Sequence, residues 1–428
     1  MSILDRITTP EIKKLNPFQL QKPVTTTLLN GIHLYLFKNK ELDLIHFSLR
    51  IRAGALFEPA KSIANSTYSL LIESASGKSA AETEEILDFY GSSFNASVAF
   101  EYVTLSFIIP KRNCLKVLPF IFDFVTNPAY NEDVLLHYKQ RKFNELEYNL
   151  LKPGYCADQL MYHTLLNPQI PVGKILCRED IENITVSEIE SYHHRTFCAE
   201  NINLFIAGNL DEDEMNLISR FCEEIPSGEP SILPQIVPDS QSEKQIIEQR
   251  DDLSQSSIRI CRRLFSYENP DRRDFSILNT VLGDYFGSRL MKNLREKKGY
   301  TYGVFSNSAY FGDNSIFYID TDVNIDKTED AINQCQMELE RLCQELVNED
   351  ELTIVQSYLQ GSLLRRLDGA AEYMRNYFVW QSAGFDETEQ KRMMDSIEQI
   401  TPDRVLQLAQ QYLNPKEFTT IVVGAGEF

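Results

Sequence analysis

The chain has 428 residues, 43% of them hydrophobic, and a formal net charge of −20 at pH 7. This length predicts roughly two to four domains rather than one core. An acidic surface without a basic patch repels phosphate backbones, and the sequence contains neither a membrane-spanning apolar run nor a secretory signal. We therefore expect no nucleic-acid or membrane partner and a cytoplasmic location, with the eight cysteines, none in a CxxC pair, as free thiols.

The first half of the chain alternates between strand and helix patterns. Apolar residues recur at every second position in the strands and at every third or fourth position in the helices. One helix start is marked by Thr185 with Glu188 three residues later, which is a capping-box pattern. In chain order we predict strands at 31–38 and 44–52, helices at 63–74 and 80–90, strand character over 94–109, helices at 117–124, 133–151 and 156–166, the capped helix after Thr185, and a strand at 203–207.

A proline-rich segment, residues 226–252, follows this half. Its four prolines are separated mainly by serine, glutamine and glutamate, so it cannot form one regular element. We interpret it as an inter-domain linker.

The second half repeats the order of the first. Thr401 to Gly424 spans the same number of residues as Thr185 to Gly208, and each segment contains a helix followed by a strand that ends at glycine. The strand pattern at 258–264 likewise matches the one at 45–51. Two unrelated α+β domains could produce a similar order, but the matched closing segments favour duplication.

We therefore predict the α+β class, with two duplicated domains at 1–225 and 253–428 joined by the linker. Each domain is expected to contain an antiparallel or mixed β-sheet packed by helices.

Residues 287–304 carry the most informative pattern in the second half. Leu290 and Leu294 are four residues apart and a cationic turn ends at Gly299, which predicts a helix with a glycine cap. Alternation from Tyr300 onward predicts that a strand follows directly. Arg295 on the helix and Tyr302 on the strand could face one site. The structural alternative is an arginine that complements the helix dipole and a tyrosine in the core.

This duplication, together with the Leu-Arg-Glu-Lys-Lys-Gly-Tyr-Thr-Tyr-Gly-Val run at 294–304, resembles the pitrilysin or insulinase (M16) family of zinc peptidases, in its two-domain branch. The resemblance covers nearly the whole chain and implies the family's LuxS/metalloenzyme-like α+β fold. In that family, an HxxEH motif on the first long helix supplies two zinc ligands and a catalytic base, and a downstream glutamate supplies the third ligand.

The zinc motif itself is lost in this chain. Asn65 and Ser69 occupy the histidine positions, Tyr68 replaces the base, and Glu147 falls about where the third ligand is expected. Amide and hydroxyl oxygens are poor zinc ligands compared with imidazole, and none of the six histidines forms an HxxxH or HxxEH pair. We therefore expect no metal in this chain.

Arg295 and Tyr302, in contrast, match the positions of an arginine and a tyrosine that bind the substrate carbonyl and the oxyanion in related peptidases. The resemblance implies the non-zinc-binding subunit of a heterodimeric zinc endopeptidase that is inactive alone. Its partner would be a homologue with HxxEH that holds the zinc, and its substrate a peptide or unfolded polypeptide. A homodimer is possible without that partner.

Two further interpretations stay open. The chain could be a catalytically dead scaffold or peptide-binding protein of the same fold. It could also be a substrate-recognition subunit, which in this family is marked by a glycine-rich loop. The corresponding segment, 281–287, has only two glycines, so this interpretation ranks last.

Overall fold

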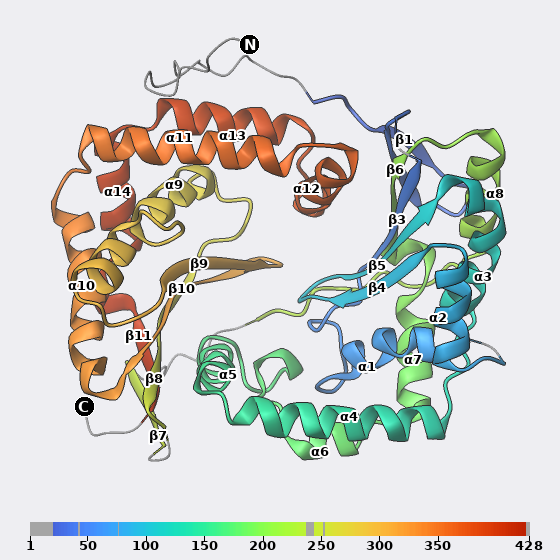
Figure 1. Cartoon of the computed structure of the whole chain (residues 1–428), viewed down its shortest axis with the longest axis horizontal. Coiled ribbons are helices and arrows are strands. Elements are labelled where there is room, and N and C mark those ends of the chain that lie inside the picture. Colours follow the sequence, from blue (N-terminus) through green and yellow to red (C-terminus); the bar gives the residue numbers. More distant parts are fainter. Residues whose placement is uncertain (1–19, 42, 76, 237–243, 251–252, 425–428) are drawn as a thin grey trace, which may run out of the picture.

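A computed structural model describes residues 20–41, 43–75, 77–236, 244–250 and 253–424 (Figure 1). Each half of the chain builds one β-sheet with helices packed against it. The first sheet has the order β1-β2-β6-β3-β5-β4 and the second has the order β7-β11-β8-β10-β9. The strands are β1 (Val24–Thr27), β2 (His33–Lys38), β3 (Leu44–Ile51), β4 (Ser93–Val98), β5 (Val103–Pro110), β6 (Ile202–Gly208), β7 (Gln245–Gln249), β8 (Gln255–Leu264), β9 (Val304–Phe311), β10 (Asn314–Asn324) and β11 (Thr419–Gly424).

The two sheets have the same topology once β1 is set aside. Strand β2 pairs in parallel with β6, as β7 does with β11, and the remaining pairs are antiparallel in both sheets. Matching order and matching strand directions in both halves confirm the predicted α+β class with a duplicated domain.

The helices cover the sheets in a matching sequence. They are α1 (Ile63–Ser69), α2 (Ala80–Phe89), α3 (Cys114–Thr126), α4 (Glu132–Leu150), α5 (Pro153–Leu165), α6 (Arg178–Glu182), α7 (Val186–Thr196), α8 (Glu212–Glu223), α9 (Arg272–Leu282), α10 (Thr328–Gln344), α11 (Glu349–Arg366), α12 (Ala370–Ser382), α13 (Thr388–Gln399) and α14 (Pro402–Tyr412). A π-type helical segment, Met291–Lys297, lies between α9 and β9. Within the described ranges, none of these helices is both long and apolar enough to span a membrane.

Local sequence signals explain several helix ends. The predicted capping box of α7 is present, because Thr185 Oγ1 accepts a hydrogen bond from the Glu188 N–H at 3.2 Å and Glu188 Oε2 accepts one from the Thr185 N–H at 2.9 Å. Helix α8, which the sequence analysis did not predict, has a similar box formed by Asp211 and Glu214. Such reciprocal bonds satisfy backbone donors that have no partner within the helix.

Two predicted boundaries are wrong. Strand β9 begins at Val304 rather than Tyr300, because Gly299 adopts a left-handed φ of 67° and the Thr301 hydroxyl bonds both the N–H and the C=O of Gly303. Residues 300–303 therefore form a connector, and the strand begins after it. Strand β7 lies within the predicted linker, where it pairs with β11. Residues 237–243 and 251–252 of that linker lie outside the described part.

The two halves exchange one helix each. Helix α5 of the first half packs on β8 and β11, whereas α12 of the second half packs on β2 and β6 (Figure 1). Both are the third long helix after the central hairpin of their half. Phe205 on β6 lies 4.3 Å from Phe378 on α12 between ring centroids. Each sheet therefore buries aromatic and aliphatic side chains against a helix of the other half.

Polar contacts at the same interface fix its geometry. On α5, Asp158 accepts a hydrogen bond of 2.7 Å from Arg259 Nε on β8. The turns of the two equivalent hairpins also meet, with the rings of Phe100 and Phe311 4.5 Å apart. The halves are thus joined through both exchanged helices and both hairpin turns.

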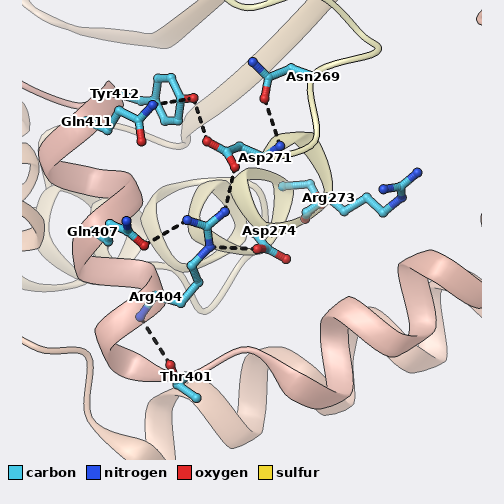
Figure 2. Close-up of polar contacts among 10 residues, drawn as sticks. Asn269, Asp271, Arg273, Asp274, Thr401, Arg404, Gln407, Gln411 and Tyr412 are labelled. Carbon is cyan, nitrogen blue, oxygen red and sulfur yellow. Dashed lines mark hydrogen bonds and ion pairs between the residues drawn. The ribbon is translucent and has the colours of Figure 1, made fainter.

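A polar cluster fastens α14 to the start of α9, as Figure 2 shows. The Arg404 guanidinium donates to Asp271 at 2.7 Å and to Asp274 at 2.9 Å, and the Tyr412 hydroxyl donates to Asp271 at 2.7 Å. Arg404 is thus shared by two carboxylates and holds α14 against α9, the helix before the Met291–Lys297 segment.

Candidate functional site

Arg295 and Tyr302 are brought together by the end of the Met291–Lys297 helical segment. Met291 and Leu294 anchor this segment in the core. Its end turns back because the Tyr300 N–H donates to Leu294 C=O at 2.9 Å around Gly299. The Arg295 Cζ atom consequently lies 5.1 Å from the centroid of the Tyr302 ring. The predicted juxtaposition of these two side chains is therefore present in the structure.

Tyr302 faces outward, and Arg295 beside it is half-buried. The Tyr302 residue is 90% exposed, so it is not the core tyrosine of the structural alternative. Among the described residues, no carboxylate forms an ion pair with Arg295. Its planar donors are consequently available to a ligand oxygen.

A third residue completes this group, and the sequence analysis missed it. The Phe286 ring lies 4.3 Å from Arg295 Cζ, closer than the Tyr302 ring, and Phe286 is 60% exposed. The guanidinium thus lies within cation–π distance of two aromatic rings. A large apolar residue in a loop between two glycines, Gly283 and Gly287, was the available signal.

The three residues at the positions of the zinc motif, Asn65, Tyr68 and Ser69, do not all lie on one face of α1. Asn65 and Ser69 share a face, and Asn65 Oδ1 accepts hydrogen bonds from the Ser69 hydroxyl at 3.4 Å and from the Tyr138 hydroxyl at 3.1 Å. Tyr68 points into the core, where its hydroxyl lies 2.7 Å from that of Thr196. Burial raises the pKa of Tyr68 far above its ordinary value. A phenol held in this way cannot act as a base for a water on the Asn65 side.

Glu147 is not brought to this site. Its carboxylate is 69% exposed on α4 and lies 3.5 Å from Arg178 Nη1. Glu145, two residues earlier, lines the same pocket as Asn65 and pairs with Lys142 at 2.8 Å. Successive helix residues differ by about 100° in direction, so Glu145 and Glu147 face nearly opposite ways.

The pocket beside Asn65, here called the α1 pocket, has a volume of about 280 Å³. It contains Glu58, which is 7% exposed and accepts a hydrogen bond of 3.1 Å from the Ala64 N–H. Burial raises the Glu58 pKa to about 7, even though that bond and Lys61 act against the shift. Its lining residues are Ala55, Glu58, Lys61, Ser62, Asn65, Val98, Lys142, Glu145, Leu146, Asn149, Tyr155, Leu176 and Ile181.

These residues do not fit a zinc ion. The donor set at α1 consists of an amide, a hydroxyl and a tyrosine turned into the core, and the two carboxylates of the pocket, Glu58 and Glu145, are already bonded to the Ala64 N–H and to Lys142. In the part of the chain that the structure describes, no group of three or more His, Cys, Asp or Glu residues could hold a metal. His193 is instead a core residue whose Nε2 lies 3.0 Å from the Val125 carbonyl, and burial lowers its pKa to about 4.

The chain is similar in sequence to M16 and zinc-protease proteins. Residues 183–359 match the family model described as the peptidase M16 inactive domain. An uncharacterized zinc protease of Rickettsia felis is 24% identical over 361 residues, which cover 82% of this chain and 86% of that protein. A second one, from Rickettsia bellii, is 25% identical over 367 residues, which cover 82% of this chain and 87% of that protein.

Solved structures share the fold over nearly the full length. A peptidase M16 inactive domain from Pseudomonas fluorescens superposes with a TM-score of 0.87 at 20% identity, covering 95% of this chain and 98% of that one. A protease from Helicobacter pylori superposes with a TM-score of 0.84 at 17% identity, covering 94% of this chain and all of the other.

Proposed function

We propose that this chain is a member of the pitrilysin/insulinase (M16) peptidase family, of the type that lacks HxxEH. On that premise, it is the metal-free subunit of a two-chain zinc endopeptidase. Its partner is a homologue with HxxEH, which holds the zinc that activates water. This chain supplies Arg295 and Tyr302, and it cleaves nothing alone.

The exposure of Tyr302 beside the Arg295 guanidinium carries this proposal. Tyr302 is 90% exposed, and the guanidinium beside it has no carboxylate partner in the described ranges. Such an arrangement contributes little to folding stability, which favours a role in binding. A fixed cation stabilises negative charge on a carbonyl oxygen, and the phenol donates a hydrogen bond beside it. In the proposed complex, Arg295 and Tyr302 hold the substrate carbonyl and stabilise the oxyanion.

The substrate in this proposal is an extended peptide or an unfolded segment that adds as a strand. Both β4 and β9 are edge strands. However, β9 is covered near Tyr302, because the Ser306 N–H donates to Gly283 C=O and Asn279 Nδ2 donates to Ser306 C=O. Among the described residues, no strand pairs with the outer side of β4, so it is the better candidate for pairing with a peptide backbone.

The test uses the chain co-purified with an HxxEH homologue encoded in the same genome. We expect Arg295→Ala to lower peptide turnover by about a hundredfold, as the loss of one oxyanion donor does. Arg112→Ala, which removes an exposed arginine of the other half, is the matched control and should leave turnover unchanged. Equal turnover in all three proteins would contradict the proposed role.

A second candidate is a peptide-binding or scaffold protein without catalysis. The bonds from Ser69 and Tyr138 to Asn65 favour it, since they rebuild the lost zinc site as a neutral hydrogen-bonded network. Under this function, peptide binding persists but no HxxEH partner confers cleavage. A homodimer would then be the expected assembly.

We place the protein in the cytoplasm as part of the same proposal. All eight cysteines are free thiols. This is the state expected of a reducing compartment.

A further inference from the structure

The α1 pocket presents hydrogen-bond donors where the family's zinc ligands are expected. Asn65 uses its Oδ1 atom to accept two hydroxyl bonds, while its Nδ2 donates to no residue of the described chain. Lys61 Nζ donates to the Val172 carbonyl at 3.3 Å. Because an ammonium has three N–H donors, two remain for a ligand. The pocket therefore suits a ligand that brings acceptor oxygens.

The charges around the pocket single out Lys61. Lys142 is already paired with Glu145 at 2.8 Å, and the Glu58 carboxylate is engaged by the Ala64 N–H. Within the described ranges, no carboxylate lies within ion-pair distance of Lys61. Burial lowers the pKa of Lys61, and the Glu58 and Asp180 carboxylates oppose that shift from beyond ion-pair distance. A ligand carboxylate would therefore be its first direct ion-pair partner.

The walls of the pocket and the strand beside it indicate what carries those oxygens. Val98, the last residue of β4, lines the pocket together with Leu146, Leu176 and Ile181. A peptide paired along the free edge of β4 would therefore reach the pocket at one end. Its terminal side chain would meet the apolar wall while its terminal oxygens meet Lys61 and Asn65.

We infer that the α1 pocket binds the free C-terminal carboxylate of a peptide with an apolar last residue, through Lys61 Nζ and Asn65 Nδ2. This inference deepens the peptide binding proposed above, on which it rests, and it names the part of the peptide that the pocket recognises. Where zinc would bind a carbonyl oxygen in the family, this chain has the N–H donors of Lys61 and Asn65, which can bind carboxylate oxygens.

The test is a binding measurement on the full chain alone. The probe is a fluorescein-labelled octapeptide that ends in leucine, prepared with a free C-terminus and with a C-terminal carboxamide. By fluorescence polarisation, we expect the acid to bind at least about tenfold more tightly than the amide, since charge-assisted bonds are about twice as strong as neutral ones. Lys61→Gln should abolish that difference, and so should Asn65→Asp, which places a negative charge beside the carboxylate.

Lys116→Gln is the matched control. It removes the same charge from an exposed position on α3 and should retain the preference for the acid. Equal binding of acid and amide by the unaltered chain would overturn the inference, as would failure to bind either peptide. Equal effects of Lys61→Gln and Lys116→Gln would also overturn it. Circular dichroism melting curves of the variants verify that each is folded.

The two proposals fail separately. If acid and amide bind equally well and Arg295→Ala still lowers turnover of the complex, only the carboxylate site is refuted. If the acid preference is found but turnover does not depend on Arg295, the catalytic role is refuted and the pocket stands.

Discussion

The hydroxyl of Tyr68 lies 2.7 Å from the hydroxyl of Thr196, in the interior of the first half. Thr196 in turn donates to the Tyr192 carbonyl at 2.6 Å. Tyr68 is therefore the first member of a buried hydrogen-bond chain that joins α1 to α7. The phenol at this position serves packing, because it is fully buried and its hydroxyl is already bonded.

The size of that packing contribution can be measured. We expect Tyr68→Phe to lower the free energy of unfolding by about 1 kcal/mol, because it removes one buried hydrogen bond and keeps the ring. Tyr68→Glu places a carboxylate at the same buried position, so we expect it to cost more than about 3 kcal/mol. Urea denaturation of the two variants decides the order, and a Glu variant as stable as the Phe variant would contradict this account.

Zinc binding can serve as a reporter of the geometry around α1. Asn65 and Ser69 share a face across from Glu145. We therefore expect the double variant Asn65→His, Ser69→His to bind about one zinc ion per chain, since two imidazoles and a carboxylate make a three-ligand set. The readout is the zinc content after dialysis, measured by mass spectrometry.

The same variant distinguishes the two glutamates. Adding Glu145→Gln should remove the zinc, whereas adding Glu147→Gln should not, because Glu147 faces Arg178. The reverse dependence would show that α4 is rotated relative to the structure described above.

The stability of the first half should depend on pH through His193. Burial lowers the pKa of this imidazole from 6.5 to about 4, so the unfolded chain binds its proton first. Its contribution is therefore complete above pH 6.5 and is lost as the pH falls toward 4, by up to about 3 kcal/mol. We expect the stability difference between the unaltered chain and His193→Gln to shrink over this interval in urea titrations. A difference that is constant with pH would refute the assignment.

The exchanged helix α12 should control the opening of the first sheet. Phe378 packs on Phe205 at a centroid distance of 4.3 Å, and truncation of a buried phenylalanine costs about 3–5 kcal/mol. We expect Phe378→Ala to increase hydrogen exchange in β2 and β6, although the substitution lies in the other half. Val379→Ala, an exposed neighbour on the same helix, should leave exchange in those strands unchanged.

Local signals allowed much of the fold to be predicted from the sequence. The Thr185 and Glu188 cap predicted α7, and the matched glycine-ended segments predicted the duplication. The same kind of cap at Asp211 and Glu214 predicts α8, although it was not used. Strand β7 was missed because the strand that it pairs with, β11, lies far away in the chain.

The candidate site was predicted in part for the same reason. Arg295 and Tyr302 are close in sequence, so one helix end and one turn bring them together. Counting residues from Ser69 predicts Glu147 as the third ligand, but the glutamate of α4 that lines the pocket is Glu145, two positions earlier. Helical periodicity shows which face of a helix is buried but not which sheet buries it, so the packing of α5 and α12 on opposite halves could not be predicted.

That packing makes each half of the chain depend on the other. A lone copy of the repeat would leave one sheet face bare and one helix without a surface to cover. Two identical copies can each lend that helix to the other, as equivalent helices do here (Figure 1). Neither half is therefore expected to fold stably on its own, because its sheet would expose the aromatic and aliphatic side chains that a helix of the other half now covers.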